Sequence, residues 1–400
     1  MDILKIINKY DEYILICLLA IAFLGTNLIQ VLVSAFIVAY LFFKKKHYSH
    51  FSLMDLRRMI CWYLLPCIVI HLYTIILSLF GVFDSNIVSS NLITYLPIIL
   101  GITIIYHYGG KGCVYVLMGL FLAFMITFIP KFFQYGIEGV LNAFKSFFLL
   151  KDNDGGSVFE LDDLVLSAGY FIILFLNSAY LKNWNKKLIA FLYLFIFIMG
   201  GKRIDVLASL IVLFFFLCIK KIKKIETKKL CLIIGYFILF CGILLIVLLS
   251  SPNFLNFLVD KLGINLMSRN YFWDGIMKTT SFSPLFLGYG RGHVKIWMLD
   301  NYAPFQNVHC DYIKMFVELG TIGYVLWLYY YLIFLQKKFW DTYGSSVGIV
   351  YFFTMIFTFI LFLTDNTESY FICGLVRVVI PIALISINKK TKNRAGEVCE

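Results

Sequence analysis

Residues 230–250 read LCLIIGYFILFCGILLIVLLS, a run without a single charged side chain. An α-helix rises about 1.5 Å per residue, so a run of this length can cross the apolar core of a membrane, which is about 30 Å thick. The preceding segment, KKIKKIETKK at 220–229, is strongly basic. A basic segment beside an uncharged run predicts a membrane-spanning helix that begins on the cytoplasmic side.

The same pattern recurs along the whole chain. Hydrophobic residues make up 61% of the 400 residues and charged residues only 14%, well below the roughly 25% that a soluble domain needs for its surface. The first apolar stretch, 14–43, is too long for one span, and we expect it to break near Gly25-Thr26-Asn27. The other apolar runs are 60–80, 92–108, 113–130, 165–181, 187–200, 203–219, 230–250, 309–335, 346–364 and 370–387. The sequence therefore predicts an all-α, polytopic integral membrane protein with about twelve transmembrane helices.

The distribution of basic residues predicts the orientation. Alternate inter-span segments on one side carry 21 Lys and Arg, whereas the longer segments on the other side carry 10. The basic side is cytoplasmic, which places both termini in the cytoplasm. The net charge of +12 is thereby explained by membrane orientation, and we expect no nucleic-acid partner.

Two segments on the outer side are long enough to build a site. We expect residues 1–400 to form a single transmembrane domain, with an outer loop at 131–164 and a large outer loop at 251–308 that carries part of the active site. An amphipathic helix at the membrane interface is predicted for 137–149. No phosphate-binding glycine loop is present, and the cysteines show neither CxxC pairs nor metal-ligand spacing. We expect neither a cofactor nor a metal.

His309 is a candidate proton-transfer residue. It stands where the outer loop ends and the apolar run 309–335 begins. A histidine changes its protonation near neutral pH and can accept or donate a proton there. The alternative is an interfacial histidine without a chemical role.

Arg203 interrupts two apolar runs on the outer side, within GGKRID at 200–205. A charge this close to the apolar core is costly and is usually paired or functional. An arginine can hold a phosphate through two parallel hydrogen bonds. The alternative is a structural pair with Asp205.

The large outer loop carries a third group, SRNYFWD at 268–274 and GYGRG at 288–292. Arg269 is a second candidate for binding phosphate. Glycines permit close backbone approach to a ligand, and aromatic faces stack on sugars. The candidate substrate-binding residues are Tyr271, Trp273, Gly288, Gly290 and Arg291. The alternative for the aromatic residues is a belt at the membrane interface.

Two charges lie inside predicted spans, Glu318 and Arg377. An ion pair between them would offset the cost of burial. The alternative is that Arg377 also faces the substrate, and both are included among the candidate substrate-binding residues.

Taken in order, these motifs resemble the O-antigen polymerase and O-antigen ligase family. The family pattern has an arginine at the outer start of a middle span, here Arg203. It continues with Ser-Arg, Trp, Pro and a Gly-x-Gly turn, and it ends with His-Asn before Glu-x-Gly-x-x-Gly. The matching residues here are Ser268, Arg269, Trp273, Pro284, Gly288, Gly290, His309, Glu318, Gly320 and Gly323. One departure is Cys310, where the family usually has asparagine.

The resemblance implies a membrane-embedded, GT-C-like glycosyltransferase in the bacterial cytoplasmic (inner) membrane, with its active site facing the periplasm. Its expected partners are an undecaprenyl-diphosphate-linked glycan donor and acceptor, membrane lipid and a chain-length regulator protein. The expected reaction polymerises oligosaccharide repeats into O-antigen or capsular polysaccharide. His309, Arg269 and Arg203 are the expected catalytic residues.

Two other functions stay open at this point. A ligase would transfer the finished glycan to lipid A-core, and it would share the same motifs. A transporter or flippase for the lipid-linked glycan would use the same arginines without making a bond. A transporter should have ionisable residues along a path through the bilayer, whereas here they gather on the outer side.

Overall fold

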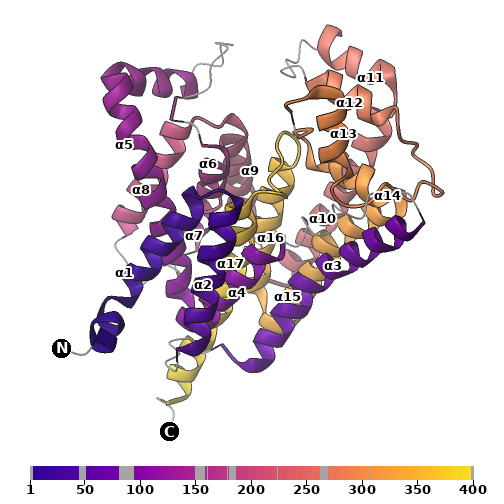
Figure 1. The fold of residues 1–400 in the computed structure, drawn as a ribbon. Coiled ribbons are helices and arrows are strands. Elements are labelled where there is room, and N and C mark those ends of the chain that lie inside the picture. The colour runs from indigo at the N-terminus through magenta and orange to yellow at the C-terminus, as the bar shows by residue number, and fades with distance from the viewer. Residues whose placement is uncertain are drawn as a thin grey trace. The chain divides into compact units, whose positions relative to one another are not determined.

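The structure is a computed structural model that describes residues 3–44, 51–80, 94–148, 158–159, 161–177, 179, 186–222, 224–261, 269–305 and 307–397. Every regular element in these ranges is a helix (Figure 1). The predicted all-α fold class is therefore confirmed. Ser268 and the polar tract 151–156 lie outside the described residues.

The chain forms two compact units. Unit 1 comprises Met1–Tyr63, Thr94–Lys221 and Ser369–Glu400, and unit 2 comprises Leu64–Ile93 and Ile222–Glu368. The boundary between Tyr63 and Leu64 falls inside one helix, α3 (Leu53–Leu79).

Unit 1 is built around α17 (Phe371–Glu397), whose residues from Phe371 to Ser386 are nearly all buried. It packs against α4 (Leu96–Tyr108), α5 (Gly110–Phe148) and α6 (Asp162–Gly169). The approach to α4 is close because Gly101 has no side chain, and a Cβ there would lie 3.1 Å from Val379. The unit also contains α7 (Ile172–Leu176), α8 (Lys186–Gly200) and α9 (Arg203–Lys220).

The first apolar stretch divides as predicted. Helix α1 (Ile3–Leu24) ends directly before Gly25, and α2 (Asn27–Phe43) begins after Thr26. The two helices pack against each other. The break lets one long apolar stretch supply two adjacent helices.

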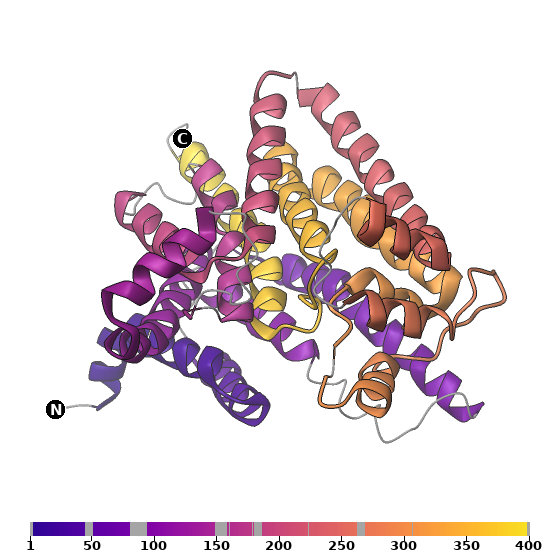
Figure 2. The ribbon, with the colours of Figure 1, turned by 90° about the horizontal axis from the view of Figure 1, so that it is seen from above.

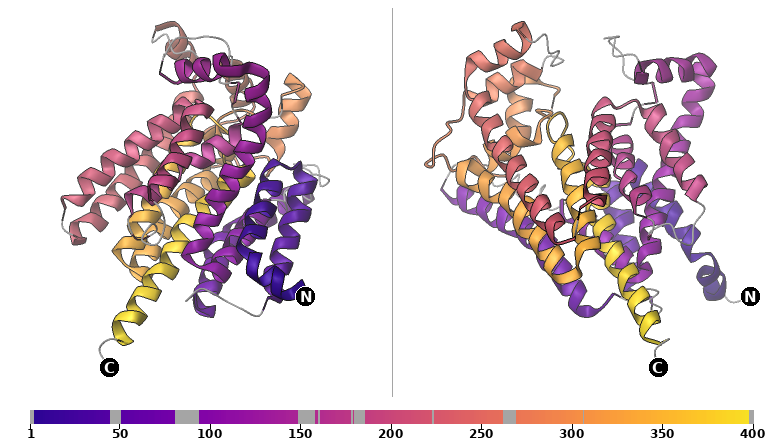
Figure 3. Two further views of the ribbon diagram at one scale, coloured as in Figure 1. Left: turned by 90° about the vertical axis from the view of Figure 1, so that its left-hand side faces the viewer. Right: turned by 180° about the vertical axis from the view of Figure 1, so that it is seen from behind.

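The amphipathic helix predicted for 137–149 coincides with the last part of α5, and its place at the membrane interface stays a prediction. The helix bends at Gly136, whose φ of +60° is left-handed, and continues to Phe148 (Figures 1 and 3). Ile137, Leu141 and Phe144 are exposed beyond the bend. Their spacing puts them along one side of the helix, as the amphipathic pattern predicts.

The apolar run 165–181 differs from the expected single span. It forms two short helices, α6 and α7, separated at Tyr170 and Phe171. The backbone N–H groups of Phe171, Ile173 and Leu174 each donate to the carbonyl three residues earlier, so the chain tightens where a continuous helix would use the carbonyl four residues earlier. The apolar composition predicted one membrane-spanning helix over this run, but it carried no information about the interruption at Tyr170 and Phe171.

Unit 2 contains the long helix α10 (Lys224–Leu249), which packs against α14 (Asp311–Tyr329) and α16 (Ser345–Leu361) (Figure 2). Helix α14 continues through the π-helical turn η4 (Tyr330–Phe334) into α15 (Leu335–Tyr343). The described residues between α10 and α14 form the short helices α11 (Pro252–Asn256), η3 (Phe257–Lys261), α12 (Arg269–Met277) and α13 (His293–Tyr302).

Within the described residues, five helices are long and apolar enough to cross a membrane, the pattern of a multi-pass membrane protein. They are Leu53–Leu79, Gly110–Lys145, Glu226–Leu249, Asp311–Tyr343 and Phe371–Lys390. Shorter apolar helices cover Asn27–Phe43, Leu96–Tyr108, Asp163–Leu176 and Ser345–Leu361. The count of twelve spans, the cytoplasmic termini and the single transmembrane domain stay predictions.

Candidate functional site in unit 2

The glycine-rich turn of the large loop pairs with a break in α14. Gly320 interrupts that helix with φ +71° and ψ −179°. The backbone N–H of Tyr289 donates to Val317 O (3.0 Å), and that of Gly290 donates to Glu318 O (2.9 Å). The Thr321 N–H in turn donates to Phe286 O (3.0 Å). The turn thus takes over backbone groups that the broken helix leaves without helical partners.

Glycine is required on both sides of this contact. Gly288 has φ +83°, and a Cβ there would lie 2.4 Å from Gly320 N. A Cβ on Gly320 would lie 2.3 Å from Leu287 C. Gly288 therefore permits close backbone approach, as expected, and the approach that the structure shows is to α14. Contact of Gly288 and Gly290 with a ligand stays a prediction.

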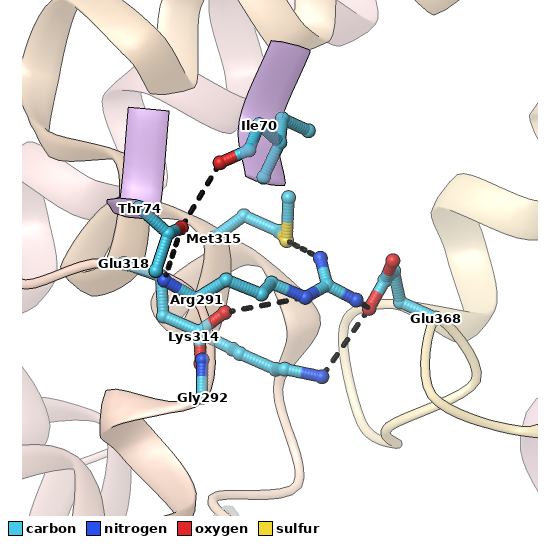
Figure 4. A network of polar contacts seen from close by, with 8 residues as sticks. All are labelled: Ile70, Thr74, Arg291, Gly292, Lys314, Met315, Glu318 and Glu368. Atoms are coloured by element: carbon cyan, nitrogen blue, oxygen red, sulfur yellow. Dashed lines mark hydrogen bonds and ion pairs between the residues drawn. The ribbon is translucent and has the colours of Figure 1, made fainter. Parts of the chain in front are cut away.

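Arg291 follows this turn and is buried among acidic partners (Figure 4). Its Nη2 lies 2.5 Å from Glu368 Oε2, and its Nε lies 3.8 Å from Glu318 Oε2. Its backbone N–H donates to Thr74 Oγ1 of α3 (3.0 Å). Burial by itself lowers the pKa of Arg291, but the charges of Glu368 and Glu318 outweigh it and hold the pKa above its ordinary value. Arg291 is therefore permanently charged, and its charge is used in ion pairs with Glu368 and Glu318.

Glu318 is fully buried, and its structural partners are now visible. Besides Arg291, its Oε1 accepts the backbone N–H of Gly292 (2.9 Å). Arg291 thus supplies an ion pair of the kind that the sequence assigned to Arg377. Arg377 is half-buried in α17, which belongs to unit 1, so its predicted pairing with Glu318 joins the two units and stays a prediction.

Helix α12 is joined to the segment that carries His309. The indole Nε1 of Trp273 donates to Val308 O at 2.7 Å, and both residues are buried. Arg269 lies four residues before Trp273 and therefore on the same side of α12. The Trp273–Val308 hydrogen bond therefore brings the helix that carries Arg269 to the segment that carries His309. A joint role of Arg269 and His309 stays a prediction.

His309 has an uncommon backbone conformation. Its φ of +51° is the only positive value among non-glycine residues in the described part of the chain. The ring is 31% exposed, and Nδ1 lies 3.3 Å from Asn366 Nδ2 and 3.8 Å from Asp365 Oδ1. A non-glycine residue in this region is strained, and such strain is often found at functional sites. Both of these contacts are made at Nδ1, on the opposite side of the ring from Nε2.

The segment behind His309 was not singled out from the sequence. Asp365, Asn366 and Glu368 lie in the short polar stretch TDNTES between the last two apolar runs. Lys314, which donates to Glu368 Oε2 (3.2 Å), was also missed. Three acidic or amide residues in so short an inter-span stretch were the available signal, but nothing in the sequence connected them with His309.

Two of the three remaining candidates, Arg203 and Tyr271, are exposed. Arg203 is the first residue of α9 in unit 1 and is exposed, whereas Asp205 is fully buried. Tyr271 is 66% exposed, and its carbonyl accepts a hydrogen bond from the Tyr302 hydroxyl (3.3 Å). Trp273 is buried and donates to Val308 O, and its contact with a sugar stays a prediction. A role of Arg203 beside Arg269 joins the two units and stays a prediction.

Comparison with known families bears on this site directly. Residues 188–328 match the family model described as O-antigen ligase. The resemblance to the O-antigen polymerase and ligase family is confirmed. No curated protein matches the chain.

The O-antigen ligase match covers Arg203, Arg269, the glycine-rich turn and His309. It ends before Asp365, Asn366 and Glu368, which only the folded chain brings to the site. Members of this family are glycosyltransferase-like enzymes, which supports an enzymatic role for the chain.

Proposed function

We propose that this protein polymerises oligosaccharide repeats carried on undecaprenyl diphosphate, at the outer face of the bacterial cytoplasmic membrane. The observation that supports it best is the Trp273–Val308 hydrogen bond, which joins the helix of Arg269 to the segment of His309. An arginine and a histidine at the mouth of a membrane helix suit a lipid-linked, anionic leaving group. The orientation rests on the distribution of basic residues described above.

The proposed reaction needs two kinds of assistance. The acceptor hydroxyl oxygen attacks the anomeric carbon, and the bond from that carbon to the diphosphate oxygen breaks. Negative charge then collects on the lipid diphosphate, where Arg269 would stabilise it, with Arg203 as the second candidate. The hydroxyl proton passes to His309.

The surroundings of His309 allow its Nε2 either to orient the acceptor hydroxyl as a hydrogen-bond donor or to accept the hydroxyl proton as a base. An Asn366 N–H that donates to Nδ1 leaves the proton of a neutral ring on Nε2, which can orient an oxygen atom by donating to it. An Asn366 amide turned by half a rotation accepts from Nδ1 and leaves Nε2 as a base. In either arrangement, the carboxylate of Asp365 stabilises the ring once it is protonated.

One assay with purified protein in detergent separates the three candidate functions. The labelled lipid-linked repeat is supplied alone, and then together with lipid A-core. Longer glycans on the lipid without lipid A-core mark a polymerase. Transfer only when lipid A-core is present marks a ligase. Failure to form any glycosidic bond under both conditions, with intact lipid-linked substrate recovered, would favour a transporter and contradict the proposal.

Arg269→Ala is expected to lower the turnover number by roughly 10²–10³-fold, the loss typical when one group that stabilises developing charge is removed. Arg269→Lys should restore only part of the activity, because a lysine cannot make two parallel hydrogen bonds to a phosphate. Both variants are measured in the detergent assay at saturating donor. Lys278→Ala, which removes an exposed cation of the same loop, serves as the control. Wild-type turnover in Arg269→Ala would exclude this residue from the reaction.

A further inference from the structure

Glu368 lies at the junction of the segments that surround His309. Its carboxylate Oε2 accepts hydrogen bonds from Arg291 Nη2 (2.5 Å) and from Lys314 Nζ (3.2 Å) (Figure 4). Its backbone N–H donates to Asp311 Oδ2 (2.8 Å). Both the side chain and the backbone of this one residue are therefore held in place.

These contacts fix the loop 362–368 around the first turn of α14. The Asp311 N–H donates to Phe362 O (2.9 Å), so Asp311 contacts both the beginning and the end of the loop. Asp311 is fully buried and lies two residues after His309. Asp311 thus connects the backbone segment of His309 to the loop 362–368, which faces the His309 ring.

The loop carries the two groups that face the His309 ring. Asp365 and Asn366 precede Glu368 by three and two residues, and both are buried. The backbone N–H of Asn366 donates to Asp365 Oδ1 (2.9 Å), and this bond orients the two residues relative to each other. A shift of Glu368 would therefore move Asp365 and Asn366 with respect to Nδ1 of His309.

We infer that Glu368 is a positioning residue for His309. Its carboxylate, held by Arg291 and Lys314, keeps Asp365 and Asn366 against Nδ1 and so sets the direction of Nε2. In this role Glu368 acts through Asp365 and Asn366. The inference rests on the proposed function, because it assigns Glu368 a role only if His309 takes part in the reaction.

The electrostatic setting supports this role. The side chain of Glu368 is only 13% exposed, and its carboxylate has two cationic partners, Arg291 and Lys314. Such partners offset the cost of removing a carboxylate from water. Arg291 also contacts Glu318 of α14, which joins the loop to the glycine-rich turn. Removing the charge of Glu368 would take away a negative charge that balances the positive charges of Arg291 and Lys314. The loop 362–368, which these ion pairs hold, would then become looser.

The test compares Glu368→Gln and Glu368→Ala with the wild type in the detergent assay. Because misplacing a reacting group by about 1 Å can cost on the order of a hundredfold, we expect kcat to fall by roughly tenfold to a hundredfold in Glu368→Ala. Glu368→Gln, which keeps the shape and one acceptor oxygen, should fall less. The KM for the lipid-linked donor should change by less than about twofold, since Glu368 does not bind it.

Hydrogen exchange of the backbone amides provides a second readout that a general loss of stability would not reproduce. We expect faster exchange in the loop 362–368 of both variants, with unchanged exchange in the middle of α16 and α17. Asp341→Asn is the matched control, because it removes an exposed carboxylate that pairs with Lys228 in the same unit. It should leave kcat, KM and loop exchange at wild-type values.

The outcomes separate this inference from the proposed function. Wild-type kcat in Glu368→Ala would overturn the positioning role, as would a raised KM at unchanged kcat. Uniformly faster exchange throughout unit 2 would also overturn it, because the effect would then be on stability. If the wild type forms no glycosidic bond, the proposed function itself fails. If the wild type is active and His309→Asn keeps its turnover, the role of His309 fails, and the positioning role of Glu368 fails with it.

Discussion

Replacing His309 with asparagine is expected to lower the turnover number by roughly 10²–10⁴-fold, the range typical for loss of a general acid or base. The protein should still insert and purify as the wild type does. Asparagine is the suitable replacement because it tolerates positive φ better than most residues, and His309 has φ +51°. The substitution therefore removes the ring chemistry while keeping the backbone. Turnover is measured in the detergent assay at saturating lipid-linked donor.

His309→Ala is the companion variant. It should lose as much activity, and it adds a backbone cost of about 1–2 kcal/mol because alanine disfavours the left-handed region. If His309→Ala were inactive and His309→Asn fully active, the residue would matter for its backbone alone. In that case Arg269 would have to act with a different proton acceptor.

Gly320→Ala is expected to destabilise unit 2 by roughly 2–5 kcal/mol, the sum of an overpacked contact and a left-handed backbone. The new Cβ would lie 2.3 Å from Leu287 C and from Phe286 O, which are backbone atoms and cannot move as a side chain would. The glycine-rich turn would separate from α14, and Arg291 would be displaced from its acidic partners. We expect a lower midpoint of thermal unfolding in detergent and loss of transferase activity.

Gly344→Ala is the matched control for this experiment. Gly344 also has a left-handed φ, +86°, but a Cβ there would meet no atom within 4 Å. It should show only the backbone cost of about 1–2 kcal/mol. The difference between the two variants measures the collision with the turn. Equal unfolding midpoints would mean that the turn adapts, contrary to the rigid contact described here.

Much of the fold could be predicted because hydrophobicity is a local property. The run 230–250 became α10, and the break at Gly25-Thr26-Asn27 appears where it was expected. The run 165–181 was predicted as one span and is two short helices. Its division depends on local backbone hydrogen bonding that apolar composition does not reveal.

In the candidate site, too, the sequence predicted the individual residues better than their contacts. Arg269 and Trp273 stood out in the large outer loop, and His309 stood out at the start of an apolar run. The structure joins the helix of the first two residues to the segment of the third. Gly288 and Gly320 were recognised as members of the motif, but their contact with each other was not foreseen. The pairing of Glu318 with Arg291 was missed because Arg291 lies outside the spans.

The sequence by itself determined the helical class, the apolar segments and the short motifs around Arg269 and His309, because each depends on residues close together in the chain. Only the tertiary structure decided that Glu368 meets Arg291, 77 residues away, and that Asn366 meets His309, 57 residues away. Contacts over such distances depend on how buried helices pack and satisfy their charges. That packing is a property of the whole unit, which no local pattern of residues encodes.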